Sequence, residues 1–130
     1  MDYLVIDDKT IGTIVAVTEQ DHIRGLMFQP WPPPIMAFPY KKAEVRKFWM
    51  KNTISPLDII FCRAGRVVAI VAGKPHSELH VGPNEPTDLV VEMPFGMAKT
   101  LNIVAGSSIK LRASLNTIAA QYYDHLKQVF

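Results

Sequence analysis

The chain reads Phe48-Trp49-Met50-Lys51-Asn52-Thr53-Ile54-Ser55-Pro56-Leu57-Asp58 near its centre, and this stretch indicates the fold most directly. Its first, bulky apolar part predicts a strand over residues 47–51. A polar cluster follows, and Pro56 then marks a turn. Asp58 stands as a lone carboxylate near the start of a second apolar strand, expected over residues 57–62. Two short strands joined by a turn are typical of a β-rich domain.

The same alternation of short apolar segments and turn signals continues through the rest of the chain. Ala64-Gly65 predicts a hairpin turn, whereas residues 41–44 read as a polar turn. Residues 74–87 contain several prolines and no periodic pattern, which predicts a long loop of a kind that is often functional. Further strands are expected over residues 10–17, 35–38, 67–72, 88–93 and 107–111.

Helical signals are fewer. Thr18 can cap a helix that runs to about Met27, with Asp21 reaching back to the cap. Pro94 suits the first turn of a second short helix. From residue 114 to about residue 129, apolar side chains recur at three- and four-residue spacing and predict an amphipathic helix; they are Leu115, Ile118, Ala119, Tyr122, Leu126 and Val129.

These elements predict a mainly β, β-rich α+β fold, in the form of a small sandwich or barrel that carries two short helices. With 130 residues the chain has the size of one domain. We expect residues 1–112 to form that β-rich domain and residues 113–130 to extend it as a C-terminal amphipathic helix.

Composition excludes several classes of function. The chain is 48% hydrophobic and 20% charged, which is enough to bury a core, and its net charge of +2 is too small to favour nucleic acid or an anionic membrane as a partner. No apolar run approaches the ~20 residues of a membrane span, and the N-terminus lacks a signal peptide. Cys62, the single cysteine, lies in an apolar run and reads as a buried side chain. A soluble, cytoplasmic protein is therefore expected.

Several short motifs resemble one known family. They are Arg24-Gly25-Leu26-Met27, the central stretch 48–58, Gly65-Arg66-Val67-Val68 and Val90-Val91-Glu92. Together they are similar to the domain of unknown function 192 (DUF192) over roughly residues 11–111. The resemblance implies a jelly-roll-like β fold with a short helix carrying the first motif, and no established activity. The helix after Leu111 looks like an addition to the family pattern.

Candidate binding residues cluster in these motifs. Arg24 and Asp58 could form an internal ion pair or cap turn amides, or Asp58 could serve a site as acid, base or ligand. Strand alternation would place Trp49 on one face with two hydrogen-bond donors, forming a shallow pocket for a ring or sugar; the opposite reading is a core strand. The full candidate set is Arg24, Trp49, Lys51, Asn52, Thr53 and Asp58.

No catalytic or cofactor motif is present in the sequence. It contains no nucleophile elbow, no phosphate-binding loop and no dinucleotide fingerprint. His76 and His80 have a spacing that binds metals on helices, but here they fall in a proline-containing loop, and a surface loop is the simpler interpretation. We therefore expect no metal and no cofactor.

The C-terminal helix allows two readings. Its apolar stripe could cover the sheet, or it could contact a protein partner or a second copy of the chain through Tyr122, Tyr123, Leu126 and Phe130.

Two hypotheses for the function follow from these observations. The first is a non-enzymatic β module with an assembly or partner-binding role, for example a structural component of a larger particle such as a virion. The second is a small-molecule or carbohydrate-binding protein, or a hydrolase-like enzyme, with its site around Trp49 and Asp58.

Overall fold

The computed structural model describes residues 1–129, with side chains described for residues 1–127. Phe130, one of the predicted partner contacts, lies outside the described residues. The strands within the described range are β1 (Asp2–Ile6), β2 (Lys9–Val15), β3 (Met36–Val45), β4 (Leu57–Arg63), β5 (Arg66–Gly73), β6 (Pro86–Pro94) and β7 (Ile109–Arg112). The helices are α1 (Glu19–Arg24), α2 (Met97–Thr100) and α3 (Leu115–Val129).

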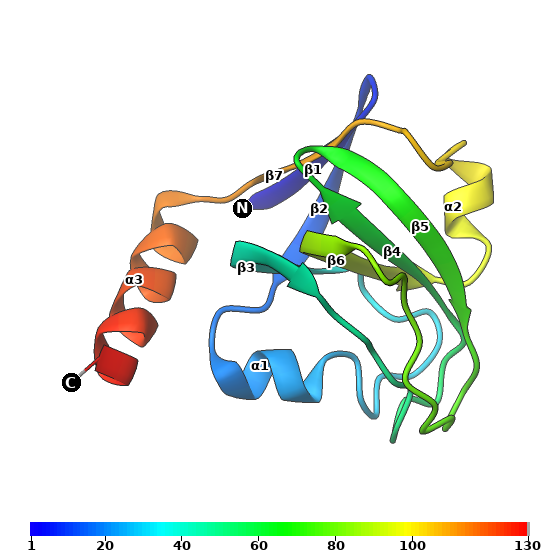
Figure 1. Cartoon of the computed structure of the whole chain (residues 1–130), viewed down its shortest axis with the longest axis horizontal. Coiled ribbons are helices and arrows are strands. Elements are labelled where there is room, and N and C mark those ends of the chain that lie inside the picture. The colour runs from blue at the N-terminus through cyan, green and yellow to red at the C-terminus, as the bar shows by residue number, and fades with distance from the viewer. Residues whose placement is uncertain (130) are drawn as a thin grey trace.

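The strands form one seven-stranded mixed sheet in the order β5-β4-β6-β3-β2-β1-β7 (Figure 1). Neighbouring strands are antiparallel except for β2 and β3, which are parallel. The sheet is open but strongly curled, and its two outer strands approach at one corner. There the Val67 amide donates to the Ser107 carbonyl at 2.9 Å, and the Ile109 amide donates to the Gly65 carbonyl at 3.0 Å.

The curled sheet buries a separate hydrophobic core on each face. Alternation along the central strands sends Ile60 and Cys62 of β4 into the first core, together with residues of β1 and β7. Ile59 and Phe61, their neighbours in sequence, enter the second core. That second core is covered by α1 and by the loop segment 46–56, and the candidate site described below lies there.

The predicted fold class is confirmed: the protein is mostly β with short helices. The hairpin at Ala64-Gly65 is present, and both residues have the positive φ values that a tight turn between strands requires (49° and 78°). The capping box that begins α1 is also as expected, because the Asp21 amide donates to the Thr18 hydroxyl while the Asp21 carboxylate accepts from the Thr18 amide. Cys62 is fully buried, and burial raises the pKa of its thiol to about 12.

Two predictions about strands are wrong. Residues 47–51 form no strand; they make a single bridge, in which Phe48 and Val81 exchange backbone hydrogen bonds of 2.8 Å. The apolar side chains of this segment pack down onto the sheet as a cover and do not belong to its ladder. Conversely, the predicted polar turn at 41–44 belongs to β3, which continues beyond an irregularity after Pro39 because β6 is long enough to pair with it.

The helix boundaries and the N-terminus also differ from expectation. α1 ends at Arg24 and not near Met27, because Gly25 leaves the helix with φ 49° while its amide donates to Asp21. Pro94 ends β6, and α2 begins only at Met97. Residues 2–6, for which the sequence analysis predicts no element, form β1, which pairs with both β2 and β7.

The C-terminal helix α3 is hydrogen-bonded to β1 at its first turn. The Asp2 carboxylate accepts hydrogen bonds from the Ser114 amide at 2.7 Å and from the Thr117 hydroxyl at 2.9 Å. Farther along, a hollow of about 700 Å³ separates α3 from β3 and α1. In Figure 1 the helix stands beside the sheet and does not lie across it. None of the helices in the described range is long and apolar enough to cross a membrane.

Candidate functional site

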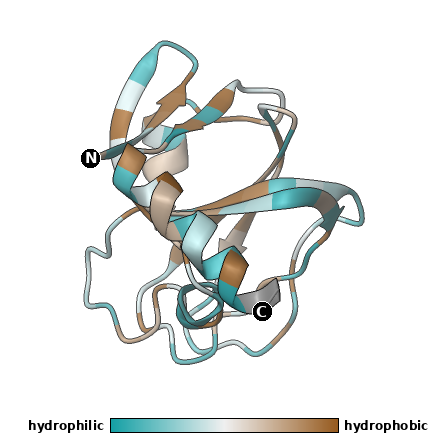
Figure 2. Cartoon of the chain, turned by 90° about the vertical axis from the view of Figure 1, so that its left-hand side faces the viewer, coloured by the Kyte–Doolittle hydropathy of each residue, from teal (hydrophilic) through white to brown (hydrophobic). Residues whose placement is uncertain are grey.

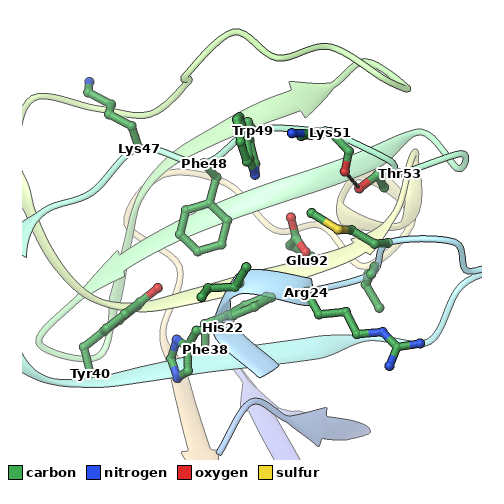
Figure 3. A pocket seen from close by; sticks show the side chains of 14 residues that line it. His22, Arg24, Phe38, Tyr40, Lys47, Phe48, Trp49, Lys51, Thr53 and Glu92 are labelled. Atoms are coloured by element: carbon green, nitrogen blue, oxygen red, sulfur yellow. Dashed lines mark hydrogen bonds between the residues drawn. The ribbon is translucent and has the colours of Figure 1, made fainter. Parts of the chain in front are cut away.

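A cavity of about 250 Å³ opens on the second face of the sheet, between α1 and the segment 46–53 (Figure 3). This volume is just below the ~300–1,000 Å³ typical of ligand pockets. The side chains that line the cavity come from α1 and the turn after it, from β3 and β6, and from the segment 46–53. They are His22, Ile23, Arg24, Gly25, Leu26, Met27, Phe38, Tyr40, Lys47, Phe48, Trp49, Lys51, Thr53 and Glu92.

Aromatic rings form much of the cavity wall. Phe48 stands edge-on to Phe38, with ring centroids 5.2 Å apart, and to Phe61 at 5.8 Å. His22 of α1 lies 5.1 Å from Tyr40 and 5.7 Å from Phe38. Edge-to-face contacts of this kind fix ring orientations. The wall is therefore a packed and preformed apolar surface.

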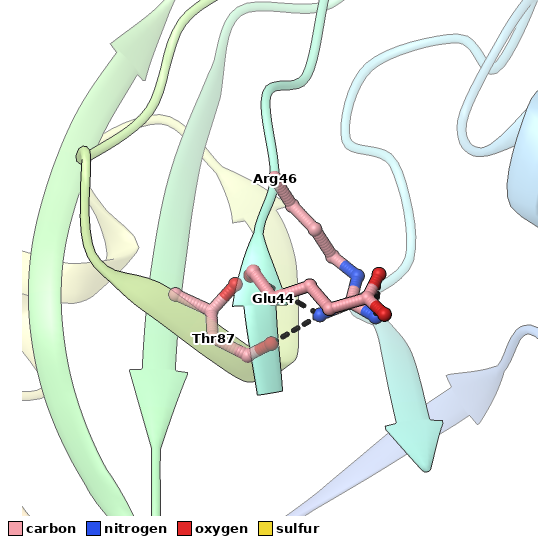
Figure 4. A network of polar contacts seen from close by, with 3 residues as sticks. All are labelled: Glu44, Arg46 and Thr87. Carbon is pink, nitrogen blue, oxygen red and sulfur yellow. Dashed lines mark hydrogen bonds and ion pairs between the residues drawn. The ribbon is translucent and has the colours of Figure 1, made fainter. Parts of the chain in front are cut away.

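Tyr40 packs in that wall against Arg46, whose polar contacts with Glu44 and Thr87 are drawn in Figure 4. The Arg46 guanidinium lies 3.6 Å from the centre of the Tyr40 ring, forms an ion pair of 3.7 Å with Glu44 and donates a hydrogen bond to the Thr87 carbonyl. Burial raises the pKa of the Tyr40 hydroxyl to about 12. This network ties the end of β3 to the start of β6 beside the cavity.

Trp49 and Lys51 lie at the mouth of the cavity. The Lys51 ammonium is 5.1 Å from the centre of a Trp49 ring, within range of a cation–π contact. The other neighbour of Trp49 is His80, whose ring is 5.5 Å away. Trp49 keeps 36% of its surface exposed, so one large aromatic side chain remains available at the rim.

Glu92 forms the floor of the cavity. It lies on β6 between Val91 and Met93, which face the first core, so its own side chain points into the second core and the cavity. Glu92 is only 4% exposed, and no other described residue forms a hydrogen bond or an ion pair with its carboxyl group. Burial raises the pKa of this carboxyl group to about 8. Such a group is mostly protonated at neutral pH.

Gly25 allows the chain to close over this carboxyl group. Its φ of 49° and ψ of −129° suit glycine, and a Cβ at this position would lie 3.4 Å from a Glu92 oxygen and 3.5 Å from the Phe38 ring. The Arg24-Gly25-Leu26-Met27 motif thus makes a tight turn directly against the cavity floor.

The structure brings together four of the six predicted binding residues. Arg24, Trp49, Lys51 and Thr53 line the cavity, although the strand alternation that grouped the last three does not exist. Asn52 does not line it. Asn52 is exposed in a turn with φ 56°, and its carbonyl accepts from the Phe28 amide at 2.9 Å.

Asp58 lies on the opposite face of the sheet, so the expected site that joins Trp49 and Asp58 does not form. Asp58 shares its face with Ile60 of the first core, and one of its carboxylate oxygens accepts from the Gly96 and Ala98 amides, each at 3.0 Å. It therefore caps the first turn of α2. The described residues contain no ion pair between Arg24 and Asp58, and the alternative of a cap on turn amides is the one observed.

Glu92 is the main residue that sequence reasoning missed. A single acidic side chain inside the apolar run Leu89-Val90-Val91-Glu92-Met93 is the signal that could have revealed it, because a buried acid needs a reason. Three further cavity residues, His22, Phe38 and Tyr40, carry no local signal and meet only through the fold.

The predicted partner contacts on α3 are exposed where they are described. Tyr122 and Tyr123 are 60% and 65% exposed, and Leu126 is half-buried. The expected histidine surface loop contains His76 and His80, both exposed. Within residues 1–127, no cluster of histidine, cysteine, aspartate and glutamate has the geometry of a metal site.

Comparison with known proteins assigns the chain to a family. The sequence model of DUF192, described as an uncharacterized ACR, matches residues 3–111. The chain belongs to the DUF192 family. All the residues that line the cavity fall inside the matched range, whereas α3 follows it. A search among curated proteins finds no match.

Two solved structures share the fold. A protein of unknown function from Novosphingobium aromaticivorans DSM 12444 is 28% identical, with a TM-score of 0.74 over 83% of each chain. A protein from Sinorhizobium meliloti 1021, named as a candidate transcription regulator, is 29% identical, with a TM-score of 0.72 over 84% of this chain and 90% of its own. The two structures therefore share the overall fold of this chain.

Proposed function

We propose that this DUF192 protein binds a small organic molecule in the cavity above Glu92. The observation that carries the proposal is a carboxyl group that is 4% exposed, has no partner among the described residues and faces a cavity with aromatic walls. Burying a polar group without a hydrogen bond costs roughly 1–3 kcal/mol. The Glu92 oxygens border the cavity, so a ligand there can form the hydrogen bond that the described protein does not supply, and this favours a binding site over a purely structural role.

The position of the family motifs supports the same proposal. Residues 24–27, residues 48–53 and Glu92 are far apart in sequence, and all three belong to the motifs on which the family resemblance rests. In the structure they meet around one cavity (Figure 3). A pocket with apolar walls and a few convergent polar groups is the usual form of a small-molecule site.

Tryptophan fluorescence can test this proposal directly. Trp49 lies at the cavity mouth, whereas Trp31 is exposed elsewhere, so Trp31→Phe leaves Trp49 as the single reporter and Trp49→Phe leaves Trp31. A collection of small organic acids, amines and neutral compounds would be titrated against both variants. We expect a saturable change with Trp49 that is absent with Trp31. Equal responses from both variants, or no response with Trp49, would contradict a ligand site in this cavity.

A second candidate function is assembly through α3, and the exposed apolar side chains of the helix favour it. Leu115, Ile118, Tyr122 and Tyr123 are each more than half exposed. Figure 2 shows α3 on the outside of the molecule with apolar and polar segments along it. We propose a second copy of the chain as the partner of this surface.

Light scattering on a sizing column tests the assembly role. The full chain should have a mass above that of a monomer, and Ile118→Glu should reduce it to 14.6 kDa, whereas Asn116→Glu, at an exposed polar position of the same helix, should not. A monomeric wild-type chain would rule out self-association through α3.

A further inference from the structure

The charges around the cavity are arranged by depth. Among the side chains that line the cavity, Glu92 is the one acid, and it lies at the floor. The basic side chains Arg24, Lys47 and Lys51 are exposed at the rim. Lys47 is already occupied, since its ammonium donates to the Pro83 carbonyl at 3.1 Å and to the Asn84 side chain at 2.8 Å. Lys51 therefore remains to meet a ligand at the mouth, whereas the Arg24 guanidinium points away from Glu92 (Figure 3).

The floor offers a hydrogen-bond donor. A protonated carboxyl group has one O–H to donate, and within the described protein no acceptor takes it. Ionisation would place a negative charge among Phe38, Phe48 and the Gly25 turn, where it would lose its hydration. A neutral acceptor on a ligand satisfies this group without creating a buried charge.

We propose that the cavity binds small organic anions that also carry an uncharged hydrogen-bond acceptor, such as a ketone. The acceptor accepts a hydrogen bond from the Glu92 carboxyl group, the apolar body lies against Phe48 and Trp49, and the anionic group meets Lys51 at the rim. This inference rests on the proposed function, because it names the class of ligand for the same cavity. Basic rim groups also attract anions from solution and raise their local concentration.

The same arrangement predicts that the affinity for an anion falls as the pH rises. The other titratable groups facing the cavity are His22 from α1, Tyr40 from β3 and the basic side chains of the rim. Burial lowers the pKa of His22 and raises that of Tyr40 to about 12, so neither becomes charged between about pH 7 and pH 9. Glu92, with its pKa raised to about 8 by burial, changes charge in this interval. Its ionisation removes the donor and repels an anion, and affinity should fall.

Three simple probes separate the possible ligand classes in the Trp31→Phe protein. Levulinate has a carboxylate and a ketone, valerate has the same carbon chain without the ketone, and pentylamine is a cation of similar length. At about pH 7 we expect levulinate to bind more tightly than valerate, and pentylamine not to bind. At about pH 9 the affinity for levulinate should be roughly tenfold lower, because one unit above the pKa leaves about a tenth of the carboxyl groups protonated.

Two variants assign the effect to Glu92. Glu92→Gln keeps a donor and cannot ionise, so it should bind levulinate at about pH 7 and lose the pH dependence. Glu92→Met keeps the shape without a donor and should bind levulinate and valerate equally. If neither variant folds, the pH profile of levulinate binding to the protein with wild-type Glu92 still tests the inference.

The result for each class of probe is decisive. Preferential binding of pentylamine, or tighter binding of levulinate as the pH rises, would overturn the anion inference and leave the cavity a binding site. No response to levulinate would overturn the inference as well. Failure of the whole compound collection at Trp49 would overturn the proposed function itself.

Discussion

A carboxyl group among aromatic rings is costly to ionise, and Glu92 is in that position. Its neighbours on β6, Val91 and Met93, contribute to the first core, whereas Glu92 lies on the other face together with Val90 of the second core. The same side chain therefore reduces the stability of the protein and gives the cavity its chemistry. Ionisable side chains whose burial costs stability are concentrated at functional sites.

Glu92 should make the protein less stable as the pH rises. Between the ordinary glutamate pKa of 4.5 and the folded value of about 8, the folded state holds a proton that the unfolded chain has lost. Raising the pH through this interval therefore favours unfolding, by an amount on the order of a few kcal/mol, and the loss ends above about pH 8. Urea unfolding of the wild type and of Glu92→Gln across this range would measure it. If the unfolding free energy fell with pH equally in both proteins, the assignment of this pH dependence to Glu92 would be refuted.

Asp58 should be important for stability and irrelevant to the cavity. Its carboxylate accepts from the Gly96 and Ala98 amides, and Asp58→Ala leaves these donors unsatisfied. We expect a loss of about 1–3 kcal/mol in unfolding free energy. Ligand titrations at Trp49 should be unchanged in this variant. If Asp58→Ala abolished binding while the protein remained folded, the separation of the two faces would be wrong.

Sequence reasoning at the residue scale identified the exposed rim better than the floor. Trp49 and Lys51 attract attention because large aromatic and charged residues alternate in a motif. Asp58 attracted the same attention, but its role depends on which face of β4 it occupies, and α2, which decides this, lies about 40 residues later. Glu92 reads as an ordinary interruption of an apolar strand until the fold shows that no side chain or backbone group among the described residues pairs with it.

Elements whose partners are close in sequence were predicted well. β4 and β5 are joined by a tight turn, so their own apolar pattern and the Ala64-Gly65 signal are sufficient. The segment 47–51 has an equally good strand pattern, but it does not pair with any strand of the sheet. It forms one bridge and covers the second core. A pattern predicts which side chains are buried more reliably than the hydrogen bonds that the backbone will make.

The turn after α1 provides a prediction at the element scale. Gly25→Ala would force a side chain onto a backbone conformation, φ 49° and ψ −129°, that suits glycine, although the added Cβ would make only ordinary contacts with Glu92 and Phe38. We expect a loss of about 1–3 kcal/mol. Gly12→Ala is the matched control, because a Cβ there meets nothing within 4 Å, and it should leave stability nearly unchanged. Denaturant unfolding compares the two, and equal effects would show that the turn is not constrained.

The first and last strands of the chain pair with each other, and this pairing could not be predicted from local patterns. β1 pairs with β7, and the Asp7 and Ser108 backbones are hydrogen-bonded at 2.9 Å across about 100 residues of sequence. Periodicity indicates that strands exist but not their order in the sheet. The cavity depends on that order, because its floor and its walls come from β6, β3 and α1.

Removing α3 should leave this architecture intact. The helix is anchored through the hydrogen bonds of Asp2 to Ser114 and Thr117, which are worth about 1–3 kcal/mol together. A chain that ends at Arg112 should keep its β-sheet circular dichroism and its response of Trp49 to ligands. Loss of cooperative unfolding in this shortened chain would show that α3 is part of the folded core.

The most direct test of the central claim is a crystal structure of the protein soaked with a collection of small organic fragments. The account predicts electron density in the cavity, with an acceptor atom of the fragment within hydrogen-bond distance of the Glu92 carboxyl group and an apolar body against Phe48. Fragments that bind elsewhere on the surface while the cavity stays empty throughout the collection would contradict it.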